Sequence, residues 1–155
     1  MKRNVYICFL LMIILVISTY VAYTISHKSN NINCRAAFNI SNYGLRASIV
    51  ATIRTNDNHG VLYYDGPLFK DDTSIGYLSR RVYFTSTMNK ESVFFKGNSL
   101  TKLKKDNVNQ INAEKILPDF FVVNKSEIFL DLVKGSDGYF FIKDNVPILY
   151  CRDLD

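Results

Sequence analysis

The chain has 155 residues, enough for about one domain, and a formal net charge of +5 at pH 7. Its lysines and arginines are spread along the sequence, and the densest basic run, 102–105, is followed at once by Asp106, which is typical of a solvated strand end and not of a nucleic-acid-binding patch. Hydrophobic residues make up 48% of the chain and concentrate at the N-terminal end, which argues against an entirely water-soluble protein.

Residues 5–25 form an uncharged apolar run without proline, long enough for a membrane-spanning helix, which needs about 20 such residues. Lys2 and Arg3 precede the run, so the positive-inside rule places residues 1–4 in the cytoplasm and the bulk of the chain across the membrane. A cleaved signal peptide is the alternative, but its apolar region is shorter, about 7–15 residues, and ends at a small-x-small site that 24–26 supplies poorly. We therefore expect an uncleaved single-pass anchor, a linker at 26–33 and an outer domain at 34–155.

From residue 34 onward, apolar and polar residues mostly alternate, which is the period of half-buried β-strands. Within 74–87, Leu78, Val82 and Phe84 share one face of a strand, and Arg80 intrudes on that face. The pattern predicts strands at 34–40, 45–54, 61–64, 74–87 and 92–96, with turns at 42–44, 56–60, 65–67, 88–91 and 97–98.

One helix is expected at 107–117, ended by Pro118 because the residue before a proline disfavours helical geometry. The segments 127–134, 139–143 and 146–152 then predict a three-strand meander. Pro147 cannot donate a ladder hydrogen bond, so its strand is placed at a sheet edge or begins after it. The expected fold is an α+β, mainly antiparallel β domain, a curved sheet or partial barrel with one short helix.

Three cysteines are present, of which Cys8 lies in the expected span and Cys34 and Cys151 lie at the two ends of the outer domain. In an oxidising compartment the outer pair is a disulfide candidate, and two buried free thiols are the alternative. Because a disulfide needs Cα atoms within about 7 Å, the pairing predicts that the first and last strands are neighbours.

Residues suited to catalysis or metal binding are scarce. His27 lies at the membrane boundary and His59 in a turn, and neither belongs to a nucleophile motif. No zinc-type cysteine or histidine spacing occurs, and Asp65, Asp71 and Asp72 lack the alternating positions of a calcium loop. We therefore expect no enzyme and no catalytic, cofactor-binding or metal-binding residue. His59 is a candidate pH sensor, with simple solvation as the alternative.

Aromatic side chains on the sheet faces either line a lipophilic pocket or form an ordinary core. The candidates for such a pocket are Phe38, Tyr83, Phe94, Phe121, Phe140 and Phe141.

The layout and three segments, GYLSRRVYF at 76–84, LPDFF at 117–121 and PILYC at 147–151, resemble the FidL-like family of enterobacterial membrane proteins. Similar architecture is found in PsaF and MyfF and, more remotely, in ToxS and VtrC. The resemblance implies an inner-membrane protein whose periplasmic domain pairs with the outer domain of a single-span, winged-helix transcription regulator. In VtrC the two outer domains complete a lipocalin-like barrel that binds bile salt, so the resemblance also implies a partial lipocalin-like barrel.

We therefore expect an accessory or co-sensor protein that stabilises or activates a membrane-bound regulator and makes no direct contact with nucleic acid. Exposed sheet edges would suit this function, because a partner strand can cover them. Two alternatives stay open: a stand-alone periplasmic protein that binds a lipid or bile salt, and a chaperone or assembly factor for a surface structure.

Overall fold

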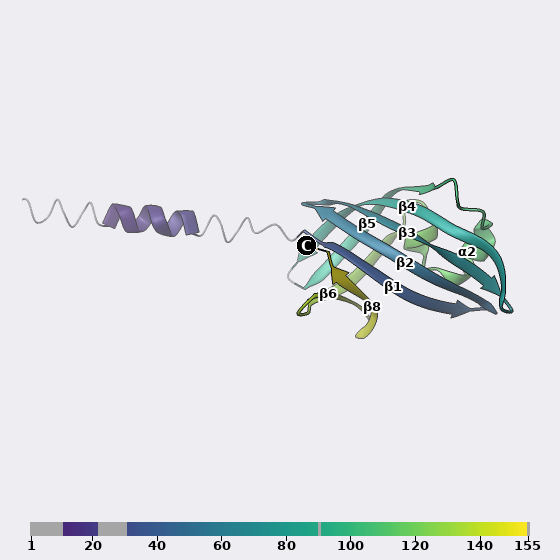
Figure 1. The fold of residues 1–155 in the computed structure, drawn as a ribbon. Coiled ribbons are helices and arrows are strands. Elements are labelled where there is room, and N and C mark those ends of the chain that lie inside the picture. Colours follow the sequence, from purple (N-terminus) through teal and green to yellow (C-terminus); the bar gives the residue numbers. More distant parts are fainter. Residues whose placement is uncertain (1–10, 22–30, 90, 155) are drawn as a thin grey trace, which may run out of the picture. The chain divides into compact units, whose positions relative to one another are not determined.

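The computed structural model describes residues 11–21, 31–89 and 91–154 (Figure 1). The chain divides into two units, Met1–Asn30 and Asn31–Asp155. Residues 11–21 of the first unit are helical. Among the described residues, no helix combines the length and the hydropathy needed to cross a membrane. Of the expected span at 5–25, the two ends lie outside the described residues.

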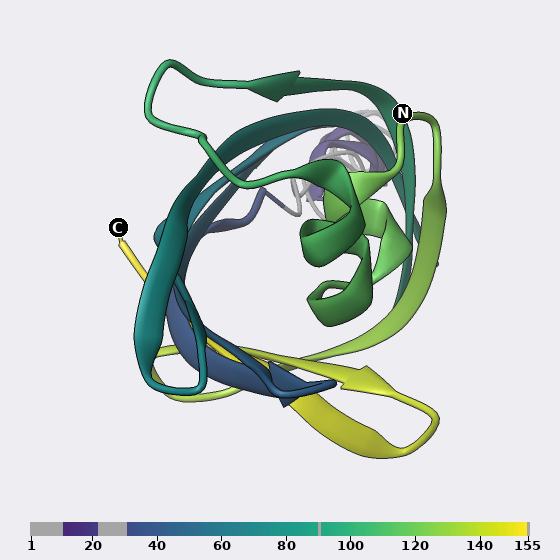
Figure 2. The same ribbon diagram turned by 90° about the vertical axis from the view of Figure 1, so that its right-hand side faces the viewer.

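The second unit is a closed barrel of antiparallel strands in which each strand pairs with the next along the chain and β8 pairs with β1. Figure 2 shows this ring end-on. The expected mainly antiparallel class is confirmed, and the barrel is closed where the sequence predicts a curved sheet or partial barrel. The strands are β1 (Asn33–Asn42), β2 (Leu45–Asn56), β3 (His59–Lys70), β4 (Thr73–Asn89), β5 (Ser92–Lys102), β6 (Glu127–Lys134), β7 (Gly138–Lys143) and β8 (Val146–Asp153).

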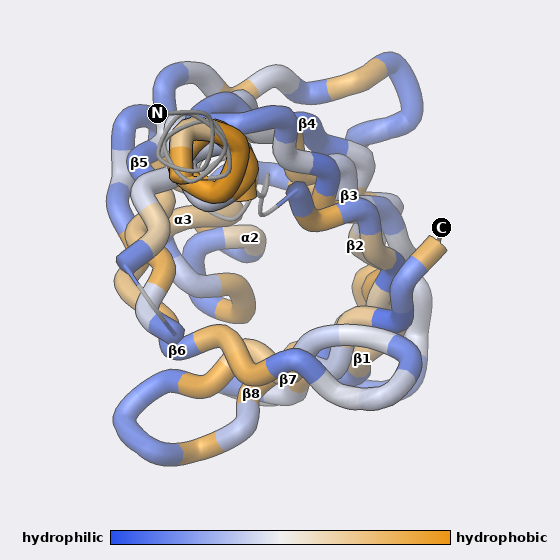
Figure 3. Tube along the Cα trace, turned by 90° about the vertical axis from the view of Figure 1, so that its left-hand side faces the viewer, coloured by the Kyte–Doolittle hydropathy of each residue, from blue (hydrophilic) through white to orange (hydrophobic). Residues whose placement is uncertain are grey.

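Alternating burial explains why these segments form a barrel wall. In β2 every second side chain, beginning at Leu45, is buried, and its neighbours face outward. Figure 3 shows hydrophilic and hydrophobic residues alternating along the strands. Residues with a left-handed backbone conformation form two of the tight turns. In the β1–β2 turn Tyr43 and Gly44 have φ of 50° and 73°, and in the β7–β8 turn Asp144 and Asn145 have φ of 51° and 64°. Such turns match the right-handed twist of the paired strands.

Strand β3 runs through Asp65-Gly66-Pro67, where the sequence predicts a turn. Gly66 is needed there because a Cβ atom would lie 1.9 Å from the carbonyl oxygen of Ser48 on β2. The β2–β3 ladder skips this stretch, whereas Pro67 continues in register with Tyr77 of β4. The predicted break is therefore wrong: glycine and proline mark a close approach of two strands inside a continuous wall.

Strand β5 likewise continues past Gly97, where a turn is predicted. The β4–β5 register shifts between Tyr83 and Phe84, opposite this glycine. A Cβ atom on Gly97 would lie 2.9 Å from the carbonyl oxygen of Ser126, and the Gly97 amide donates a hydrogen bond of 2.8 Å to that oxygen. The glycine therefore accommodates a β-bulge and the entry of β6.

Two short helices, α2 (Gln110–Ile116) and α3 (Asp119–Val122), connect β5 to β6. The predicted helix at 107–117 is shorter than expected because Asn109 caps it, accepting a hydrogen bond of 2.8 Å from the Asn112 amide through its side chain. The second helix was not predicted. Seen end-on in Figure 2, both helices lie within the outline of the ring, and Figure 1 shows α2 toward one end of the barrel.

Candidate functional site

A disulfide between Cys34 and Cys151 joins the first strand to the last. The two Cα atoms are 5.4 Å apart and 117 residues apart in the chain, and both side chains are fully buried. The bond lies beside the only two residue pairs of the described β1–β8 ladder, Cys34 with Asp153 and Arg35 with Arg152. The predicted pairing and the predicted adjacency of the first and last strands are confirmed.

Beyond these two pairs, β1 and β8 separate. In the described ladders, residues 36–42 pair only with β2, and residues 146–151 pair only with β7. Pro147 lies inside β8, opposite a register shift in β7, and this part of the strand has the edge position that its missing N–H predicts. We call this opening the seam. A groove of about 460 Å³ follows it, lined by Arg35, Ala37, Phe38, Phe140, Pro147, Ile148, Leu149, Tyr150 and Arg152.

A cavity of about 370 Å³, partly open to solvent, lies inside the same part of the barrel. Phe38, Ile148 and Leu149 line both the cavity and the groove, so the two spaces are adjacent. Among the described residues that line the cavity, Lys143 carries a charge and the others are uncharged. The remaining lining residues are Asn39, Ile40, Ile53, Leu62, Phe95, Pro118, Phe120, Phe121, Ile128, Leu130 and Phe141.

An aromatic cluster brought in by α3 forms one wall of the cavity. Phe120 is buried, and its ring centroid lies 5.8 Å from that of Phe84 and 6.0 Å from that of Phe95. Phe121 contacts Phe38 edge-on at 6.4 Å. Edge-on contacts of this kind stabilise aromatic pairs and fix the ring orientations. The helix α3 therefore shapes the cavity.

Of the six aromatic candidates, Phe38, Phe121 and Phe141 line the cavity, whereas Phe140 lines the groove. Tyr83 faces outward, and Phe94 is half-buried in the wall opposite Phe129. Phe95 and Phe120 were missed. Strand alternation places Phe95 on the face opposite Phe94, but which of the two faces the interior depends on closure of the barrel.

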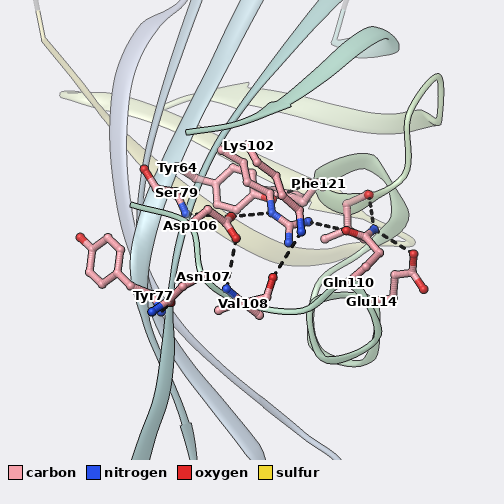
Figure 4. A network of polar contacts seen from close by, with 12 residues as sticks. Tyr64, Tyr77, Ser79, Lys102, Asp106, Asn107, Val108, Gln110, Glu114 and Phe121 are labelled. Carbon is pink, nitrogen blue, oxygen red and sulfur yellow. Dashed lines mark hydrogen bonds and ion pairs between the residues drawn. The ribbon is translucent and has the colours of Figure 1, made fainter. Parts of the chain in front are cut away.

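A buried polar network fastens the helices to the barrel (Figure 4). The Arg80 and Asp106 side chains are both 0% exposed, and Arg80 Nε donates to Asp106 Oδ2 at 2.8 Å. Arg80 also donates to Gln110 Oε1 at 3.2 Å, and Gln110 Nε2 donates to the carbonyl oxygen of Val122 at 2.7 Å. Asp106 accepts the Ser79 amide at 3.1 Å. The intrusion of Arg80 on an apolar face is therefore explained by a buried partner 26 residues away.

Tyr64 extends this network to the cavity wall. Its hydroxyl donates to the carbonyl oxygen of Phe121, and the two rings meet edge-on at 5.3 Å. Burial raises the pKa of Tyr64 well above its ordinary value, and the positive charge of Arg80 opposes part of that rise. The neutral phenol is therefore the form that holds α3 in place.

His59 lines neither the cavity nor the groove. It is the first residue of β3, directly after the turn at 57–58, and it is exposed. The acidic candidates do not converge either: Asp65 lies within β3 and accepts the Tyr77 hydroxyl at 2.5 Å, whereas Asp71 and Asp72 lie in the β3–β4 turn. Acid sensing by His59 stays a prediction.

Comparisons with known proteins give one result. No curated protein and no solved structure matches the chain. The resemblance to the FidL-like family stays a prediction. The family model described as the YqeJ C-terminal domain matches residues 31–151, from two residues before β1 to the second cysteine of the disulfide. The chain therefore belongs to the YqeJ C-terminal domain family.

Proposed function

We propose that this chain is a membrane-anchored accessory protein whose barrel pairs with the outer domain of a single-span, winged-helix transcription regulator, and that this pairing stabilises or activates the regulator. The observation that carries the proposal is the seam. Residues 36–42 of β1 pair with β2, and residues 146–151 of β8 pair with β7, but neither stretch pairs with the other across the seam in the described ladders. An unpaired strand edge is a template for a strand of another chain.

The two edges of the seam differ as templates. Strand β8 lacks a backbone donor at Pro147, whereas residues 36–42 of β1 include no proline. The groove beside them exposes the apolar side chains of Ile148 and Tyr150, at 48% and 38% of their full area. A partner strand added to β1 would cover this apolar surface and gain main-chain hydrogen bonds at the same time.

The proposed anchor is the apolar segment at 5–25, with its N-terminus in the cytoplasm and the barrel in the periplasm. In its described part, nine large apolar side chains between residues 11 and 21 are 41–71% exposed, all around the helix. The hydroxyls of Ser18 and Thr19 donate to carbonyl oxygens one turn earlier, each at 2.9 Å. A helix that is apolar on all faces, with its polar groups bonded internally, suits a lipid environment.

The pairing is tested by capturing the tagged full-length protein from crosslinked membranes and identifying its partners by mass spectrometry. We expect a single-span winged-helix regulator, and we expect its cellular level to fall when this protein is deleted. Ala37→Arg, which places a bulky charge in the groove, should abolish the crosslink. Ile111→Arg, on an exposed position of α2, is the matched control. Equal recovery with both variants, or recovery of a surface-fibre subunit alone, would contradict the proposal.

The cavity favours a second function, binding of a small lipophilic ligand. Its volume of about 370 Å³ and its aromatic lining are typical of sites for small apolar molecules. The probe is a palmitic acid carrying a diazirine, photolysed in membranes that contain the full-length protein. We expect adducts on peptides from β1 and α3 that Ile40→Trp removes and Ile75→Trp, outside the cavity lining, retains. Adducts that Ile40→Trp leaves unchanged would exclude the cavity as the site.

A further inference from the structure

Three outward-facing arginines cluster on the barrel wall near the start of β1. Arg35 is in register with Thr52, Thr52 with Tyr63, and Tyr63 with Arg81, so one row of side chains crosses four strands. Arg54 lies in the neighbouring row of side chains. It is in register with Val61, and Val61 is in register with Tyr83. We call Arg35, Arg54 and Arg81, with Tyr63 and Tyr83, the arginine belt; together with Thr52 and Val61 these residues line a shallow hollow of about 360 Å³.

The charged groups of the belt contact neutral partners. Arg35 Nε donates to Thr52 Oγ1 at 3.4 Å, and Arg54 Nε donates to Asn33 Oδ1 at 3.2 Å. Arg81 donates to the Tyr83 hydroxyl at 3.0 Å, with its guanidinium 5.9 Å from the centre of that ring.

The arginines of the belt take part in none of the ion pairs of the described residues, which are Arg46–Asp72, Arg80–Asp106 and Lys96–Glu127. The nearest carboxylate on β3, Asp65, lies two positions beyond Tyr63 and accepts the Tyr77 hydroxyl. The belt therefore concentrates positive charge on one face of the wall, which attracts an anionic partner.

We propose that the arginine belt binds anionic phospholipid headgroups of the membrane that holds the chain. This inference rests on the proposed anchor at 5–25. Arg35 lies ten positions after Ile25, and ten residues of extended chain reach at most about 36 Å, so the anchor would tether Arg35 within that distance of residue 25. Guanidinium groups bind phosphate oxygens in bidentate fashion, and tyrosine rings favour the membrane interface.

The test uses the absence of tryptophan from the chain. Tyr83→Trp gives a single fluorophore in the belt, and Tyr43→Trp gives one in the β1–β2 turn, where the tyrosine is 79% exposed. Each full-length protein is placed in nanodiscs of phosphatidylcholine alone or with phosphatidylglycerol, and quenching by neutral acrylamide is measured. Co-elution with the disc reports the anchor separately from the belt.

We expect Trp fluorescence at position 83 to be shielded only in discs with phosphatidylglycerol, and the shielding to disappear in high salt. Replacing Arg35, Arg54 and Arg81 together with alanine should weaken docking roughly 100-fold, at about fivefold per arginine near a charged surface. The matched control replaces the exposed Lys70, Lys104 and Lys105 with alanine and should retain shielding.

Three results would overturn the inference, and they can be told apart. If the protein co-elutes with the discs but position 83 is quenched equally in both lipids, the belt does not bind headgroups while the anchor stands. If the protein does not co-elute with the discs, the anchor itself is wrong. Equal shielding of positions 43 and 83 would also overturn the proposal, because it would show a general effect of the disc surface.

Discussion

Arg80 and Asp106 form an ion pair in which both side chains are fully buried. Each charge is therefore compensated by the other and not by water. Asp106→Asn should lower the free energy of unfolding by about 3–5 kcal/mol, because it leaves a buried guanidinium without a counter-charge. The measurement is urea unfolding followed by circular dichroism. Asp72→Asn is the control, since its partner Arg46 and Asp72 itself are 54% and 89% exposed and such pairs contribute little. Equal effects of the two variants would contradict the assigned burial.

Tyr64 makes the fold less stable as pH rises in the alkaline range. Its folded-state pKa is raised, mainly by burial, so the folded state keeps the phenol proton where the unfolded chain loses it. This contribution is present below the ordinary tyrosine pKa of about 10 and is lost as pH rises above it. We expect the melting temperature to fall more steeply above pH 10 in the wild type than in Tyr64→Phe. Tyr43→Phe, at an exposed position, should keep the wild-type slope.

At neutral pH, Tyr64→Phe leaves the part-buried carbonyl oxygen of Phe121 without its donor. The variant should therefore be less stable than the wild type by about 1 kcal/mol, the lower end of the cost of an unsatisfied polar group, because this oxygen is only partly shielded from water. Thermal unfolding at pH 7 measures this difference. A variant as stable as the wild type would show that the hydroxyl does not fasten α3.

At the scale of elements, α2 has only seven residues and depends on its cap and its packing. Asn109→Ala should remove the side-chain hydrogen bond to the Asn112 amide and destabilise the helix locally by about 1 kcal/mol. Hydrogen exchange at 110–116 should then be roughly fivefold faster, with β2 unchanged. Asn98→Ala, on the exposed face of β5, is the control and should leave exchange at 110–116 as it was.

Local patterns predicted most strands and their turns, because alternation and left-handed turn residues are local properties. They were wrong at Gly66 and Gly97, which read as turns in the sequence. In both places the glycine admits a carbonyl oxygen of another segment, Ser48 or Ser126, and such an approach is not visible locally. The helix α3 was missed because four residues carry too little periodicity.

The candidate site was predictable only in part, because its components are distant in the chain. Cys34 and Cys151 could be paired from their number, their positions and the expected compartment. The partner of Arg80 could not be found in this way, since nothing in the sequence selects Asp106 among the acidic residues. The cavity lining also depends on which face of each strand points inward, and that is decided by closure of the barrel.

At the scale of the whole molecule, the disulfide closes a loop of 117 residues around nearly the entire barrel. The chain-entropy model gives about 5 kcal/mol for a loop of this length. Cys34→Ser with Cys151→Ser should therefore lower the free energy of unfolding by up to about that amount, and reduction of the wild type should do the same. Urea unfolding with and without reductant measures both. An unchanged midpoint after complete reduction would show that strand pairing alone closes the barrel.

The position of this bond also decides how the domain carries mechanical load. Tension applied between the N-terminal segment and the C-terminus enters the barrel at β1 and meets Cys34 at the second residue of that strand. The covalent bond then passes the force directly to Cys151, near the end of β8, and bypasses the 116 residues in between, 35–150. The cavity, the helices and the polar network consequently lie off the force path while the bond is intact. Reduction would place them on it, and peeling of β1 would begin at its N-terminal end, where two residue pairs join it to β8.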